Sequence, residues 1–123
     1  MDMAQSITKD VERAAARLET ARKALTESLA GGEMLRPDLI DRLRGAEARY
    51  AMWELIGRVM DREMKEEGMQ AGDAAAHALT VGRRKCMEKI MSGPSGSSSH
   101  TVRALTEAEQ AAVREVYEEL GGR

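Results

Sequence analysis

In the first thirty residues, apolar or small side chains recur at alternating intervals of four and three residues. The repeat consists of Ile7, Val11, Ala14, Leu18, Ala21, Leu25 and Ser28. This spacing places every member on one face of an α-helix, and the small residues at alternate positions let a second helix approach closely. Gly31 and Gly32 then supply a stop, because glycine adopts the left-handed backbone of a helix end without steric penalty. We predict a helix over residues 6–30.

A second helix is predicted over residues 37–67, where Pro37 stands near the first position and its missing amide hydrogen costs nothing. Its repeat comprises Leu39, Leu43, Ala46, Tyr50, Trp53, Gly57, Met60 and Met64. Gly57 lies within this repeat, which favours a close approach between helices. Other apolar residues widen the stripe and indicate more than one neighbour; they are Ile40, Leu55, Ile56 and Val59. The short connection from the first helix predicts an antiparallel hairpin.

A third helix is predicted over residues 73–91, with Asp73 as its N-cap. Its apolar face is weak and consists of Ala75, Leu79, Gly82, Cys86 and Ile90. The helix ends in a basic cluster, Arg83, Arg84, Lys85 and Lys89, where positive charge opposes the negative pole of the helix dipole. Residues 1–91 are therefore expected to form one helical body.

Small and polar residues fill positions 92–100, a composition typical of a flexible linker. A C-terminal helix follows in residues 101–123, where Thr106 and Glu109 have the spacing of a capping box. We expect this helix to be tethered loosely. It could exchange with a second copy, fold back on the basic end of the third helix, or dock on a partner. The fold class is all-α: a long antiparallel hairpin, a third helix and a linker-tethered C-terminal helix.

The apolar composition indicates a thin core. Hydrophobic residues make up 42% of the chain, but 19 of its 123 residues are alanine and phenylalanine is absent. The net charge of −2 is too small to indicate disorder. Long amphipathic helices with narrow apolar seams fit this composition, and such helices often complete their burial against a partner. We therefore expect a homodimer or another protein complex.

The sequence also indicates the cellular location of the protein. No stretch approaches the ~20 apolar residues of a membrane span, and the N-terminus lacks the apolar run of a signal peptide. Cys86 is the single cysteine and cannot form an internal disulfide, so a cytoplasmic location is expected. Arginine outnumbers lysine 14 to 5 and asparagine is absent, a bias that indicates a bacterial or phage coding sequence.

No residues with the spacing of a catalytic or metal site are present. His77 and Cys86 are nine residues apart, about 180° around a helix, so they cannot act as base and nucleophile together. Asp73 is instead the expected neighbour of His77. Glu47, Glu54 and Asp61 form an acidic line, but a di-metal site of this class needs Glu-x-x-His on neighbouring helices. We predict no enzyme, no cofactor and no metal.

Nucleic acid is the alternative partner. Arg83, Arg84, Lys85 and Lys89 could contact phosphates, which would make binding salt-dependent. The stretch Leu105–Glu109 resembles the opening of the first helix in some helix-turn-helix regulators, which would imply a DNA-binding role for that one short helix. The net charge of −2 and the three aromatic residues favour a protein partner instead.

Nine methionines support this preference, because methionine suits adaptable protein-binding surfaces as well as irregular core gaps. We predict a non-catalytic protein that acts by binding another protein, as an adaptor, an assembly factor or an inhibitor of host machinery, and as a homodimer. The alternative is a dimeric DNA-binding regulator that uses the basic end of the third helix. The residues predicted at the protein interface are Tyr50, Trp53, Met60, Met64, Met87, Met91, Val113, Val116, Tyr117 and Leu120.

Overall fold

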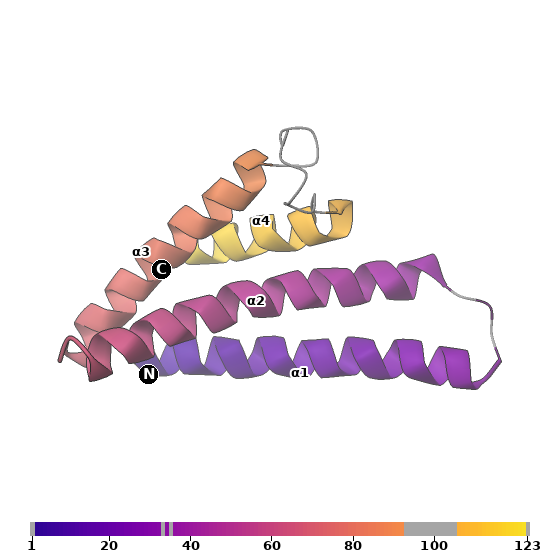
Figure 1. The fold of residues 1–123 in the computed structure, drawn as a ribbon, viewed down its shortest axis with the longest axis horizontal. Coiled ribbons are helices and arrows are strands. Elements are labelled where there is room, and N and C mark those ends of the chain that lie inside the picture. The colour runs from indigo at the N-terminus through magenta and orange to yellow at the C-terminus, as the bar shows by residue number, and fades with distance from the viewer. Residues whose placement is uncertain (1, 33, 35, 93–105, 123) are drawn as a thin grey trace.

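A computed structural model of the chain describes residues 2–32, 34, 36–92 and 106–122. Four α-helices account for most of this part of the chain, and it contains no β-strand. They are α1 (Met3–Ala30), α2 (Pro37–Lys65), α3 (Ala71–Ser92) and α4 (Glu107–Gly121). The all-α class and the arrangement predicted from the sequence are confirmed (Figure 1).

The helix ends differ from the predicted ones where capping groups lie outside the apolar repeats. Helix α1 begins at Met3 rather than near Ser6, because Asp2 caps it: the Gln5 amide donates to Asp2 Oδ1 at 2.8 Å. Helix α2 ends at Lys65, and Gly68 turns the chain with a φ of +66°. Helix α3 begins at Ala71, before the predicted cap at Asp73.

The predicted capping box of the last helix is present. The Glu109 amide donates to Thr106 Oγ1, and the Thr106 amide donates to Glu109 Oε1, both at 3.2 Å. Helix α4 therefore begins at Glu107. The first residues of the predicted C-terminal segment, 101–105, and most of the predicted linker lie outside the described residues.

Helices α1 and α2 form the predicted antiparallel hairpin, side by side along the long axis of the molecule (Figure 1). The buried residues of α1 are all members of the four-and-three repeat: Ile7, Ala14, Leu18, Ala21 and Ser28. Gly57 faces α1, since a β-carbon there would lie 3.2 Å from Val11 Cγ2. The absence of a side chain at Gly57 therefore brings the two helices together.

Helix α2 is the centre of the fold and packs against α1, α3 and α4. Its broad apolar stripe places Met52, Trp53, Ile56, Val59 and Met60 in the core. Three neighbouring helices require three contact faces on α2. This explains why apolar residues beside the repeat widen the apolar stripe of this helix.

Helix α4 folds back on its own chain, which is one of the three arrangements expected for it. It runs parallel to α2 and antiparallel to the second half of α3, where Gln110 Nε2 donates to the Ile90 carbonyl at 3.3 Å. Its inner face is buried and consists of Ala112, Val113, Val116 and Leu120. The C-terminal helix is thus part of the core.

Candidate protein-binding surfaces

The predicted interface residues separate into a buried and an exposed group. Buried in the core of this chain are Trp53, Met60, Val113, Val116 and Leu120. Tyr50 and Tyr117 are partly buried against that core. Exposed are Met64, Met87 and Met91. Since α4 covers α2 and α3, the buried group serves the fold of one chain. The exposed methionines and the partly buried tyrosines remain accessible without unfolding.

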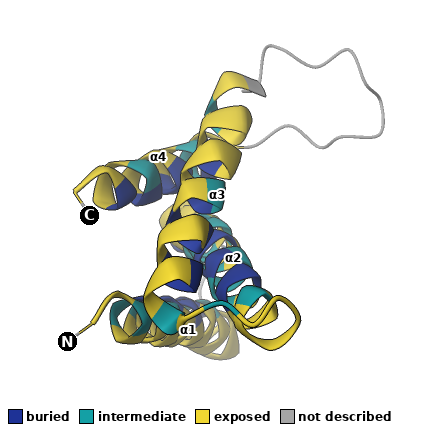
Figure 2. Cartoon of the chain, turned by 90° about the vertical axis from the view of Figure 1, so that its left-hand side faces the viewer, coloured by how far each residue is buried: buried dark blue, intermediate teal, exposed yellow. Residues whose placement is uncertain are grey.

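Met87 and Met91 lie one turn apart on α3 and border a hollow of about 500 Å³ between α3 and α4. We name this the methionine surface; its residues are Thr80, Arg83, Arg84, Met87, Glu88, Met91 and Tyr117. Met87 is 39% exposed and Met91 is 77% exposed. Much of the outer side of α3 is exposed in Figure 2.

The basic residues of α3, predicted as the alternative nucleic-acid contacts, have separate roles in the structure. Arg83 Nη2 donates to the Leu120 carbonyl at 2.9 Å and thereby satisfies a carbonyl at the end of α4. Lys85 Nζ lies 3.5 Å from Glu88 Oε2. Arg84 and Lys89 form no ion pair with any residue in the described ranges. Two of the four cations are thus engaged within the chain.

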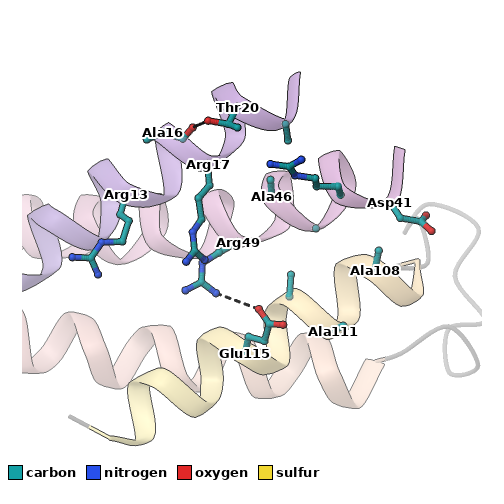
Figure 3. A pocket seen from close by; sticks show the side chains of 14 residues that line it. Arg13, Ala16, Arg17, Thr20, Asp41, Ala46, Arg49, Ala108, Ala111 and Glu115 are labelled. Carbon is teal, nitrogen blue, oxygen red and sulfur yellow. Dashed lines mark hydrogen bonds and ion pairs between the residues drawn. The ribbon is translucent and has the colours of Figure 1, made fainter. Parts of the chain in front are cut away.

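A second surface, which sequence reasoning missed, lies where α1 and α4 flank α2. It is a groove of about 590 Å³ that we name the arginine groove. Its residues are Arg13, Ala16, Arg17, Thr20, Ala21, Asp41, Arg42, Gly45, Ala46, Arg49, Ala108, Ala111, Ala112 and Glu115 (Figure 3). Small residues form much of its lining, and four arginines stand along it.

Arg49 joins α2 to α4 inside the arginine groove. Its side chain is only 13% exposed; Nη1 lies 3.6 Å from Glu115 Oε2, and Nη2 is paired with Glu119 Oε1. Arg17, on α1, lines the same groove (Figure 3). Arg17 and Arg42 form no ion pair within the described part of the chain. The groove therefore carries unneutralised positive charge.

The sequence could predict only part of the arginine groove. The spacing of Arg42, Gly45, Ala46 and Arg49 places these residues on one face of α2, which is a usable signal. The other walls come from α1 and α4, and their position beside that face follows from the tertiary packing alone.

His77 pairs with a different carboxylate from the one expected. Its Nδ1 lies 3.0 Å from Glu63 Oε1 on α2, so the side chain bridges α2 and α3 rather than contacting Asp73. Glu54 and Arg58 form the ordinary ion pair between successive turns at 3.5 Å. No three histidine, cysteine, aspartate or glutamate side chains within the described ranges could hold a metal ion.

Cys86 is fully buried between the helices. Burial removes water from around the thiol and raises its pKa from 9.0 to about 11, while the nearby positive charge of Lys89 lowers it by less. The thiol is therefore protonated at neutral pH, and the thiolate that would act as a nucleophile is scarce.

None of the helices described is both long enough and apolar enough to span a membrane. A scan against protein-family models, a search of curated proteins and a search of solved structures each gave no match to this chain.

Proposed function

We propose that this chain is a non-catalytic helical protein that acts by binding another protein, and that the methionine surface joins two copies of it as a homodimer. The observation that carries the proposal is the exposure of Met87 and Met91, adjacent on one helix, in a chain with few large apolar residues. Contiguous apolar surface of this kind marks protein-binding sites, and methionine adapts its shape to a partner.

The charges beside the methionines support self-association. Arg84 and Glu88 lie one turn apart at the same hollow as Met87. A two-fold interface uses the same surface of both copies. If two α3 helices pair in antiparallel orientation about this point, Arg84 of one copy lies opposite Glu88 of the other. The methionine surface is in this sense complementary to itself.

The buried thiol supports the non-catalytic part of the proposal. Cys86 is fully buried and its pKa is raised to about 11, which makes it a poor nucleophile. A single thiol also agrees with a cytoplasmic location, which we include in the proposal.

The dimer is tested by the mass in solution of the variant M87E/M91E. Two added carboxylates on the methionine surface oppose its burial, so we expect the mass to fall from about twice the 13.5 kDa of one chain to that of a monomer. M34E is the matched control, because Met34 is 89% exposed and lies in the α1–α2 connection. A wild-type monomer at every concentration, or an M87E/M91E variant that stays dimeric, contradicts the proposal.

A charge exchange tests the antiparallel arrangement. R84E and E88R each place like charges opposite one another in the proposed dimer, so each weakens it, whereas R84E/E88R restores opposite charges and recovers the dimer. Sedimentation equilibrium measures all three dissociation constants. A double variant weaker than either single variant rules out this pairing.

The alternative function, a dimeric DNA-binding regulator, draws support from Arg84 and Lys89, which lack ion-pair partners in the described part of the chain. It predicts duplex affinity that falls steeply with salt and is lost when Arg83, Arg84 and Lys85 are neutralised. Anisotropy of a labelled duplex measures this, and unchanged affinity in that variant removes the alternative.

A further inference from the structure

The arginine groove is the open side of the helical arrangement. Helix α2 packs against α1, α3 and α4, while within the described ranges no Cα atom of α1 lies within 8 Å of one in α4. The side of α2 that carries Gly45 and Arg49 is therefore the floor of the groove, with α1 and α4 as its walls (Figure 3). A further helix laid between α1 and α4 would complete the enclosure of α2.

The lining residues recur at helical spacing on all three helices. The residues of the groove extend from Arg13 to Ala21 on α1 and from Asp41 to Arg49 on α2. At 1.5 Å per residue, each row is about 12 Å long, or roughly two helical turns. Because alanine and glycine occupy much of the lining, a backbone can approach closely, as in other helix-in-groove contacts.

The charge of the groove is opposite to that of the chain. Four arginines against Asp41 and Glu115 give the lining residues a formal charge of +2, whereas the whole chain carries −2. Two of these arginines are paired with carboxylates outside the lining, Arg13 with Asp10 and Arg49 with Glu119. Arg49 is engaged by Glu115 and Glu119, but Arg17 and Arg42 have no ionic partner among the residues described. Guanidinium groups bind carboxylates in a bidentate geometry, so these two arginines select for an acidic partner.

We infer that the arginine groove binds an acidic amphipathic helix of a partner protein. The inference rests on the proposed protein-binding function and adds the chemistry of the partner. Carboxylates of the incoming helix pair with Arg17 and Arg42, and its small or apolar residues pack on Ala46 and Ala111. A single-stranded nucleic acid is a poorer occupant, because the described residues that line the groove include no aromatic side chain for base stacking.

The probe is a lactam-stapled helical peptide of roughly 15 residues, with glutamates one turn apart on one face and alanine and leucine beside them. We expect fluorescence anisotropy to show saturable binding to the full chain, and no binding of the same peptide with lysine in place of glutamate. The inference is overturned if the two peptides bind equally, if neither binds, or if a DNA duplex binds more tightly at the same ionic strength.

Two charge-matched variants locate the site. R17E/R42E reverses the two arginines without ion-pair partners in the groove, and R22E/R62E reverses two exposed arginines of α1 and α2 outside it. We expect R17E/R42E to weaken binding about tenfold or more and R22E/R62E to change it less than about threefold. Equal losses in both variants overturn the inference, because they indicate attraction to overall charge.

A steric variant separates shape from charge. Ala16 is exposed at the groove wall, so A16W fills the groove while leaving its charge unchanged, and circular dichroism checks that it folds. We expect A16W to weaken peptide binding about tenfold or more, and unchanged binding contradicts the inference.

The result of the peptide-binding experiment does not depend on whether the chain forms a dimer. M87E/M91E removes the methionine surface and leaves the groove intact, so its peptide affinity should equal that of the wild type. A loss of the dimer with retained peptide binding supports the groove and the methionine surface separately. A dimer without peptide binding retains the proposed function and overturns the inference.

Discussion

Gly82 of α3 lies so close to Ile56 of α2 that a β-carbon at residue 82 would come within 2.5 Å of Ile56 Cγ1. Both residues are buried, and Leu120 of α4 is the next neighbour, with its Cδ1 at 3.6 Å from the same point. Three helices therefore meet at one glycine. This contact permits the close packing of a chain that has few bulky side chains.

We expect G82A to lower the free energy of unfolding by about 1–3 kcal/mol, because the added methyl group overpacks a buried contact. G72A is the matched control. A β-carbon at Gly72 meets no atom within 4 Å, so alanine there should be neutral or stabilising by up to about 1 kcal/mol through helix propensity. Urea unfolding measures both, and a G82A variant as stable as G72A contradicts the close approach of α2 and α3.

Arg49 should anchor α4 to α2. R49A removes the pairs with Glu115 and Glu119, and because Arg49 is mostly buried while both glutamates are partly exposed, we expect a loss of about 1–2 kcal/mol. R49K should recover little of this, since an ammonium group cannot reproduce the planar guanidinium contacts.

The control for R49A is R58A, which removes the exposed ion pair with Glu54 and should cost less than about 0.5 kcal/mol. Amide hydrogen exchange in α4 locates the effect, with faster exchange between residues 112 and 120 in R49A alone. Equal exchange in the two variants would show that Arg49 does not anchor α4.

Stability should fall at alkaline pH in a way that depends on Cys86. The folded-state pKa of about 11 lies above the ordinary 9.0, so the fold favours the protonated thiol. This contribution is fully present below pH 9 and is lost as the pH rises through 9 toward 11. We expect the difference in unfolding free energy between wild type and C86A to shrink over this interval. A constant difference from pH 8 to pH 11 contradicts the burial of the thiol.

The fold was predictable from the sequence where apolar or small residues recur along a single helix face. The buried residues of α1 follow the four-and-three repeat, and Gly57 lies at the predicted close approach. Capping is where the prediction was weakest, since Asp2 precedes the apolar repeat and extends α1 beyond its expected start. A polar cap and an apolar repeat are separate signals, and at this end of α1 the cap lies outside the repeat.

The surfaces were less predictable than the fold. Val113 and Val116 were expected at an interface because the polar stretch before them indicated a separate helix, but α4 folds back and buries them. The arginine groove needs three helices in register, and no local pattern reports the position of α4 beside α2. Met64, Met87 and Met91 stay exposed, and their place at an interface remains a prediction.

The most direct test of the protein-binding role is methionine oxidation of the wild-type chain by dilute hydrogen peroxide, followed by mass spectrometry over a range of protein concentrations. If the methionine surface pairs two copies, the oxidation rates of Met87 and Met91 fall as the concentration rises. Met34, 89% exposed and in the α1–α2 connection, should oxidise at a constant rate. Rates for Met87 and Met91 that stay constant across the same range, as for Met34, would contradict the account.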